Sequence, residues 1–225
     1  MKKQNEAGAP PEIGPEPADH TIEKSLQPRT VEHKNFEFDP QTGNVRWLDG
    51  GETPYRLVVD GLVDKGAAFS YEDLKKFEQT RQVSDFHCVE GWSVLDLEWE
   101  GFRFSEILSR ITIRPEAGFV VLHAMGETDY VAQGLNHYIE SFAVADLLDH
   151  GKEILFALRL GGRPLARANG GPLRLVSPRE LAYKSIKFVS RIEMTKRPTE
   201  GWWTIANPIY PMHAPVPAGR LRKKK

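Results

Sequence analysis

Cysteine is nearly absent from this 225-residue chain, in which Cys88 is the only one. A single thiol forms no intramolecular disulfide, and it excludes every four-ligand zinc site built on two or more cysteines. No hydrophobic run approaches the ~18 apolar residues that a membrane-spanning helix needs. We therefore expect a chain without disulfide bonds and without a membrane span.

An excess of charge is also missing. The sequence has 30 basic and 31 acidic residues, a formal net charge of -1, whereas a general nucleic-acid binder normally carries a basic excess. We expect no nucleic-acid partner. The N-terminal residues contain neither an apolar signal segment nor a pair of arginines, which predicts a cytoplasmic location.

Several common functional motifs are missing as well. The sequence has no GxxxxGK[ST] and no strand-linked GxGxxG, so the usual nucleotide cradles are not predicted. The lack of GxSxG argues against a serine hydrolase, and the histidines show no HExxH spacing of a zinc site.

Composition divides the chain into three parts. Residues 1–30 are rich in proline and charge, which predicts a flexible tail. Residues 31–200 are expected to form the globular domain. Residues 201–225 are expected to form a loop-like C-terminal extension, whose basic tip is either solvated or contacts an acidic partner.

Short β-rich runs alternate with short helical ones in the domain. Val, Ile, Leu and Phe predict strands at 55–61, 85–89, 118–125, 154–160, 173–177 and 186–194. Ser70, Ser105 and Ser141 are each placed as the N-cap of a short helix. We predict an α+β fold with mixed β-sheets and short peripheral helices, because regular helices of ~10–15 residues do not separate the strands.

Cys88 lies in the first of two stretches suited to chemistry, DFHCVEGWSVLDLEWEGFRFSEIL at 85–108. It ends an apolar run and meets a turn-like break, so its thiol is expected at a strand end, where a pocket can form. An inert, buried thiol is the alternative. The aromatic residues that follow either line a substrate funnel or pack in the core; they are Trp92, Trp99, Phe102 and Phe104.

The second stretch, residues 159–187, has seven basic residues against one glutamate, a balance of +6. Its Asn-Gly-Gly-Pro turn lets backbone N–H groups approach an anion, and arginine provides a planar fork for phosphate oxygens. We interpret the stretch as a phosphate clamp, with a solvated basic loop as the alternative.

Together the two stretches resemble the molybdopterin-binding catalytic domain of the sulfite oxidase superfamily. CVEGWS, WEGFRFSEIL and NGGPLRLVSPRELAYKSIKFVSRIEM are most similar to its small single-domain branch, which includes the catalytic subunit of periplasmic methionine sulfoxide reductase. The resemblance implies a mononuclear molybdenum oxidoreductase that transfers an oxygen atom to or from a small-molecule substrate. It further implies Mo-molybdopterin as the cofactor and an electron-transfer partner such as a cytochrome or a quinone-linked protein.

The resemblance also implies the site residues. Cys88 falls on the cysteine that binds molybdenum, a metal that prefers soft, anionic sulfur. Lys184 is expected to add positive potential, since a phosphate dianion is costly to bury without cationic donors. The positions implied to contact the cofactor are His33, Asn35, Phe36, Cys88, Ala124, Asn169, Arg174, Lys184, Ser185, Ile186 and Lys187.

Two positions depart from the family pattern. His87 stands where relatives often carry arginine, and His123 or Ala124 stands where one branch carries a cofactor-contacting threonine. His87 and His123 are candidates for delivering protons during catalysis, with structural hydrogen bonding as the alternative. These departures motivate an alternative function, a non-catalytic anion-binding or interaction module that keeps the fold without metal.

Overall fold

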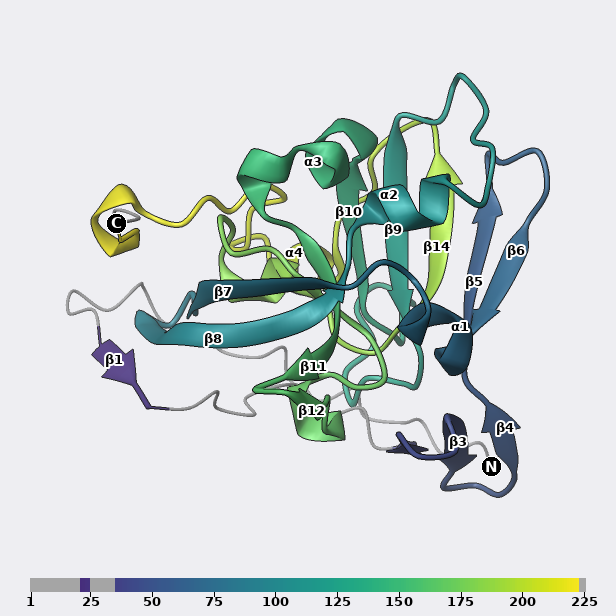
Figure 1. Ribbon diagram of the computed structural model, residues 1–225. Coiled ribbons are helices and arrows are strands. Elements are labelled where there is room, and N and C mark those ends of the chain that lie inside the picture. Colours follow the sequence, from purple (N-terminus) through teal and green to yellow (C-terminus); the bar gives the residue numbers. More distant parts are fainter. Residues whose placement is uncertain (1–20, 25–34, 223–225) are drawn as a thin grey trace, which may run out of the picture.

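The computed structural model describes residues 21–24 and 35–222. Within these ranges the chain forms three β-sheets with short helices around them (Figure 1), which confirms the predicted α+β fold with mixed sheets. The helices are α1 (Tyr71–Lys75), α2 (Phe104–Leu108), α3 (Val144–Leu148) and α4 (Trp202–Ala206). Short 3-10 turns are η1 (His150–Lys152), η2 (Arg167–Asn169), η3 (Ala182–Lys184) and η4 (Ala218–Arg220). None of the helices in the described ranges has the length and apolar character required to cross a lipid bilayer.

A six-stranded sheet carries the cysteine stretch. Its strands are β1 (Thr21–Glu23), β7 (Thr80–His87), β8 (Trp92–Phe102), β11 (Leu155–Leu160), β12 (Arg163–Pro164) and β13 (Arg174–Val176). β7 and β8 form a long antiparallel hairpin (Figure 1), and β1 and β11 share the other edge of β8. Thr21–Glu23 were expected in the flexible tail, but they pair with Trp92–Val94 at the start of β8. β11 pairs with the other end of β8, from Trp99 to Phe102.

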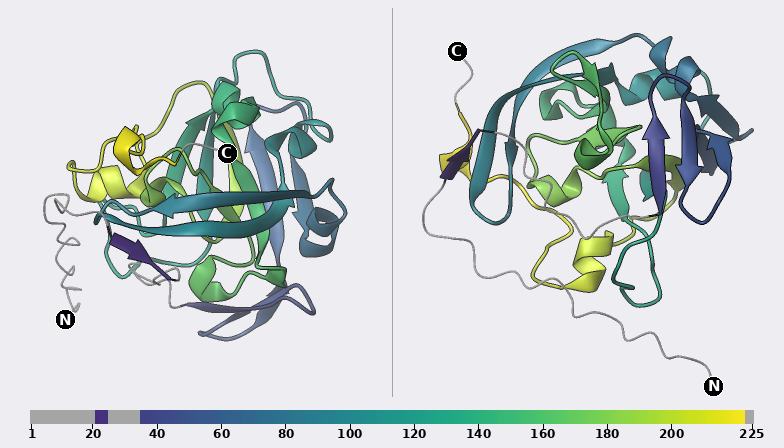
Figure 2. Two further views of the ribbon diagram at one scale, coloured as in Figure 1. Left: turned by 60° about the vertical axis from the view of Figure 1, so that its left-hand side comes forward. Right: turned by 90° about the horizontal axis from the view of Figure 1, so that it is seen from below.

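A five-stranded sheet and a three-stranded sheet complete the architecture. The five-stranded sheet has the order β10 (Ile139–Ala143), β9 (Phe119–Ala124), β14 (Val189–Thr195), β5 (Arg56–Gly61) and β6 (Ala67–Ser70). The small sheet contains β2 (Phe36–Asp39), β3 (Asn44–Trp47) and β4 (Glu52–Pro54). Figure 2 shows the β7–β8 hairpin running crosswise to the strands of the five-stranded sheet.

Most strands predicted from apolar runs are confirmed, namely β5, β9, β11, β13 and β14. The run at 85–89 forms only the last part of β7, which begins at Thr80 and ends at His87. Its first half is polar in sequence and is held by pairing with β8. Cys88 therefore lies just beyond the strand rather than in it.

The predicted helix caps show how local signals compete with strand pairing. Ser70 caps α1 with a capping box, in which the Asp73 amide donates to the Ser70 hydroxyl at 3.1 Å. The other two predictions are wrong. Ser105 lies inside α2, and Ser141 lies inside β10, where it pairs with Val121 of β9.

One hydrophobic core is shared by all three sheets and α4. Trp99, Phe102 and Phe104 are each at most 1% exposed and Trp92 is 7% exposed, which confirms core packing for these aromatic residues. Trp202 of α4 is fully buried, so the extension expected to be loop-like begins with a packed helix.

Candidate active site

Cys88 lies in the turn that joins β7 to β8. Its amide donates to the Trp92 carbonyl at 2.8 Å, and the Gly91 amide donates to the Cys88 carbonyl at 3.2 Å. Gly91 has a φ of 86°, a left-handed conformation that glycine adopts without strain. Cys88 is half-buried, and its Sγ lies 3.9 Å from the Glu90 carboxylate. It is thus not sealed in the core, as the inert alternative required.

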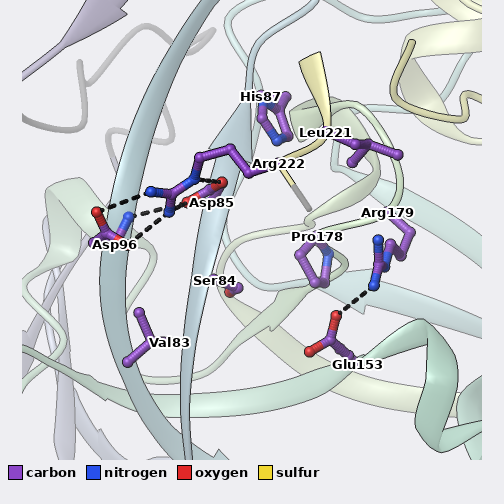
Figure 3. A pocket seen from close by; sticks show the side chains of 10 residues that line it. All are labelled: Val83, Ser84, Asp85, His87, Asp96, Glu153, Pro178, Arg179, Leu221 and Arg222. Carbon is purple, nitrogen blue, oxygen red and sulfur yellow. Dashed lines mark hydrogen bonds and ion pairs between the residues drawn. The ribbon is translucent and has the colours of Figure 1, made fainter. Parts of the chain in front are cut away.

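His87 faces a different part of the structure. It lines a cavity of about 650 Å³ beside the C-terminal residues Leu221 and Arg222 (Figure 3), and Cys88 is not among the described residues that line this cavity. His87 is 2% exposed, and its Nδ1 lies 2.6 Å from the Ser93 hydroxyl. Its burial and its contact with the Ser93 hydroxyl favour structural hydrogen bonding over proton delivery at the Cys88 sulfur.

Arg174 of β13 connects the predicted phosphate clamp to the cysteine strand. It is 2% exposed, and its guanidinium donates to the carbonyls of Asn169 at 2.8 Å and Ser185 at 3.0 Å. The same guanidinium lies 5.3 Å from the ring of Phe86, two residues before Cys88. The fold therefore brings together the two stretches that the sequence keeps about 80 residues apart.

Lys187 and Arg167 lie near Arg174. Lys187 Nζ donates to the Ala168 carbonyl at 2.8 Å, and the Arg167 guanidinium lies over the Phe36 ring at 5.4 Å. Arg167 Nε is buried without a hydrogen-bond partner in the described part of the chain. A buried donor left unpaired is costly, so this nitrogen is suited to an acceptor supplied by a ligand.

Arg167, Arg174 and Lys187, here called the cation cluster, form a positively charged group. The ion pairs found among the described residues include no carboxylate partner for any of the three. Burial, and then the charges of Arg174 and Arg167, lower the pKa of Lys187 to about 7. Burial lowers the pKa of Arg174 to about 10. Such shifts arise when cations are buried together without an anion, and they favour the phosphate-clamp interpretation over a solvated loop.

Phe36 and Ala124 adjoin the segment that carries Asn169. The Phe36 ring packs against Phe188 with centroids 5.3 Å apart, and the Phe188 amide donates to the Gly170 carbonyl at 3.1 Å. Ala124 is buried at the end of β9, where it pairs with Val189.

The other implied contact residues occupy varied places. Asn35 donates from its side chain to Glu127 at 3.2 Å. Ile186 is 5% exposed and belongs to the hydrophobic core. His33 lies outside the described residues.

Lys184 does not join the cation cluster. Its ammonium is ion-paired with Glu140, and both side chains are 3% exposed. The expectation that Lys184 adds positive potential is wrong, because Glu140, 44 residues earlier in the chain, compensates its charge.

His123 belongs to a polar network on the five-stranded sheet. Its Nε2 lies 3.1 Å from the Glu193 carboxylate, and its Nδ1 lies 3.3 Å from His137 Nε2. Burial lowers the pKa of His123, while the hydrogen bond with Glu193 opposes this effect. Since neighbouring strand residues alternate in direction, His123 faces away from Ala124, which favours its structural alternative too.

Sequence reasoning missed two residues near Cys88. Arg220 donates to the Cys88 carbonyl at 2.8 Å, although 132 residues separate the two. Tyr210 is close enough that burial, and then the charges of Cys88 and Glu90, raise its pKa. Arg220 belongs to the basic C-terminal tip, which was expected to be solvated or to contact an acidic partner, and no local signal marks Tyr210. Arg167, by contrast, was visible in the basic stretch, two residues before Asn169.

Mo-molybdopterin, the group implied by the resemblance, fits these residues. Its phosphate requires cationic donors, which the cation cluster supplies together with the unpaired Arg167 Nε. The metal requires a soft ligand on an accessible position, and the partly exposed Cys88 is the only cysteine of the chain.

Comparisons with known proteins agree with this fit. The family model described as "Oxidoreductase molybdopterin binding domain" matches residues 43–203. The uncharacterized oxidoreductase YuiH of Bacillus subtilis (strain 168) is 35% identical over 162 residues, which cover 72% of this chain and 75% of YuiH. The protein-methionine-sulfoxide reductase catalytic subunit MsrP of Pseudomonas syringae pv. tomato (strain ATCC BAA-871 / DC3000) is 30% identical over 194 residues, which cover 80% of this chain and 56% of MsrP.

A solved structure supports the fold. The sulfane dehydrogenase SoxCD from Paracoccus pantotrophus aligns with a TM-score of 0.55 and 21% sequence identity, covering 64% of this chain and 39% of that chain. The family match includes both the Cys88 turn and the cation cluster. The chain therefore belongs to the oxidoreductase molybdopterin binding domain family of the sulfite oxidase superfamily, and it is a molybdopterin-dependent oxidoreductase with a molybdenum-molybdopterin cofactor.

Proposed function

We propose that Cys88 binds molybdenum through its thiolate and that the enzyme transfers an oxygen atom to or from a small substrate. The observation that carries the proposal is the contact between the two halves of the site, where the Arg174 guanidinium lies 5.3 Å from the Phe86 ring. A cofactor with a metal and a phosphate needs a thiolate and a cation cluster in one site. This chain offers both on connected elements.

Each half of the site has a separate task. The cation cluster, Asn169 and Ser185 hold the pterin and its phosphate, and Cys88 holds the metal. When bound, the cofactor supplies two-electron redox chemistry and accepts or gives up the oxygen atom. Burial, and then the charges of Cys88 and Glu90, raise the pKa of Tyr210, so its phenol stays protonated near the cysteine turn.

A sulfoxide is the substrate class we propose to test first, because the name of one relative describes a protein-methionine-sulfoxide reductase. Reduction of a sulfoxide to a thioether consumes two electrons and two protons and releases the oxygen as water. The electrons require a donor, for which we propose a cytochrome or a quinone-linked protein. The same relative is named a catalytic subunit, which indicates that it works with a second subunit.

The alternative of a non-catalytic module gains no support, since the matching family and the named relatives are oxidoreductases. The cytoplasmic location was predicted from N-terminal residues that lie outside the described ranges, and it stays a proposal.

Metal analysis of the wild-type protein and a Cys88→Ser variant tests the proposal. Both proteins are made in a host that supplies the cofactor, and we expect about one molybdenum per wild-type chain. The spectrum of the half-reduced wild-type protein, recorded by electron paramagnetic resonance, should show thiolate ligation. Cys88→Ser should lose more than about 100-fold in sulfoxide turnover, since even a group that only supports a metal ligand contributes about 10- to 100-fold.

Arg81→Ala is the matched control, because the Arg81 side chain is 86% exposed and lies on β7, the strand that leads into the cysteine turn. This variant should keep the metal, the spectrum and the turnover of the wild type. Full turnover with an unchanged spectrum in Cys88→Ser would eliminate thiolate ligation.

A further inference from the structure

The C-terminal strap, defined as residues 214–222, crosses the tip of the β7–β8 hairpin. Figure 1 shows this yellow segment beyond the end of the hairpin at which β7 turns into β8. Its first residues pair with the loop after β13, because the Leu181 amide donates to the Ala214 carbonyl at 2.7 Å and the Val216 amide donates to the Arg179 carbonyl at 3.0 Å. The strap therefore links the loop that leads to Ser185 with the turn that holds Cys88.

Arg220 makes the strap's contact with the cysteine turn. It is 8% exposed, and its Nη2 lies 2.8 Å from the Cys88 carbonyl, 2.9 Å from the Trp92 carbonyl and 3.2 Å from the Ser93 hydroxyl. The two carbonyls flank the turn, so one buried guanidinium ties its first and last residues together. Charge-assisted hydrogen bonds of this kind are stronger than neutral ones.

Arg222 anchors the strap separately. It binds Asp85 of β7 at 2.5 Å and Asp96 of β8 at 2.6 Å, at the rim of the cavity shown in Figure 3. Its side chain is 48% exposed. Arg222 thus fixes the strap to the hairpin without contacting the cysteine turn, which makes it a matched control for Arg220.

We propose that Arg220 is a positioning residue for Cys88, which fixes the backbone of the turn so that the thiolate keeps one orientation toward the metal. The inference rests on the proposed thiolate ligation. A small misplacement of a reacting group can cost about 100-fold in rate, and Arg220 holds the same Cys88 and Trp92 carbonyls that accept the backbone hydrogen bonds described within the turn. Arg220, although remote in sequence, then acts on the active site through the backbone of the cysteine turn.

Three full-length variants test the proposal: Arg220→Met, Arg220→Lys and Arg222→Met. In cofactor-free protein, hydrogen exchange is measured at the amides of Cys88 and Gly91, which donate within the turn. In loaded protein, the measurements are molybdenum content, the half-reduced spectrum, kcat and KM. Arg220→Met should exchange at least about tenfold faster at these amides, shift the spectrum, and lower kcat by about 10- to 100-fold with KM unchanged. Arg220→Lys should lie between Arg220→Met and wild type, and Arg222→Met should match wild type.

Wild-type exchange and an unshifted spectrum in Arg220→Met would overturn the proposal, as would equal effects of Arg222→Met and Arg220→Met. If Arg220→Met does not fold, the proposal is tested with Arg220→Lys instead. Hydrogen exchange as slow as in wild type would then show that the guanidinium is not needed. Failure of the proposed ligation is distinguishable, because it appears as an unchanged spectrum in Cys88→Ser. The hydrogen-exchange measurement needs no cofactor, so it tests whether Arg220 stabilises the cysteine turn even if Cys88 does not bind the metal.

Discussion

The lowered pKa of Lys187 indicates that its site is suited to an anionic ligand. Lys187 is half-buried, and its ammonium shares the neighbourhood of Arg174 and Arg167 without a carboxylate among the described residues. Burial, together with these two charges, lowers its pKa from 10.5 to about 7. A bound phosphate would reverse this effect, because an anion stabilises the charged ammonium.

We expect cofactor-free protein to gain stability as pH rises from about 7 toward 10.5, because the folded pKa of Lys187 lies below its unfolded value. In this window the unfolded chain binds more protons, so the free energy of unfolding rises with pH. Below about pH 7 the cost of the buried charge is fully present. Urea denaturation at pH values from about 6.5 to about 10 covers this window. The free energy of unfolding should rise more steeply with pH for wild type than for Lys187→Met. Parallel curves for the two proteins would contradict the prediction, and the exposed Lys76→Met serves as control.

At the scale of elements, a buried ion pair joins β10 to η3. Glu140 and Lys184 are each 3% exposed, and Lys184 also lies 5.0 Å from the Phe142 ring. Gly201 leaves room for the carboxylate, since a Cβ there would lie 2.6 Å from Glu140 Oε2. The pair therefore holds the loop before β14, which carries Ser185 and Lys187, against the five-stranded sheet.

Lys184→Met should destabilise the fold by about 3–5 kcal/mol, because it leaves Glu140 buried without its partner. The double variant Glu140→Leu/Lys184→Met should recover most of this loss, since two apolar side chains of similar volume need no charge compensation. Chemical denaturation of the wild type and the two variants measures both effects. A loss below about 1 kcal/mol in the single variant, the range of surface pairs, would show that the pair is not buried in solution.

At the scale of the whole molecule, the cofactor is expected to act as a stabilising ligand. A ligand that binds only the folded state stabilises it by about 4 kcal/mol at 1,000 times its dissociation constant. For a chain of this length, that corresponds to a rise of about 10 °C in the thermal midpoint. Calorimetry of loaded and cofactor-free protein should show this rise, and Lys187→Met should reduce it. Equal midpoints for loaded and free wild-type protein would mean that the cation cluster holds no ligand.

The sequence by itself determined the features that depend on neighbouring residues. Apolar runs located five of the strands, and Ser70 located a helix start. The lone Cys88 and the +6 segment identified the two chemical elements of the site, because residue type and local charge are properties of the chain alone.

Only the tertiary structure decided which groups face one another. Pairing with β9 placed Ser141 in a strand, and Glu140 neutralised Lys184. Arg220 reached the cysteine turn from 132 residues away. Each of these outcomes depends on a contact distant in sequence, where burial, hydrogen bonding and charge pairing outweigh the preferences of neighbouring residues.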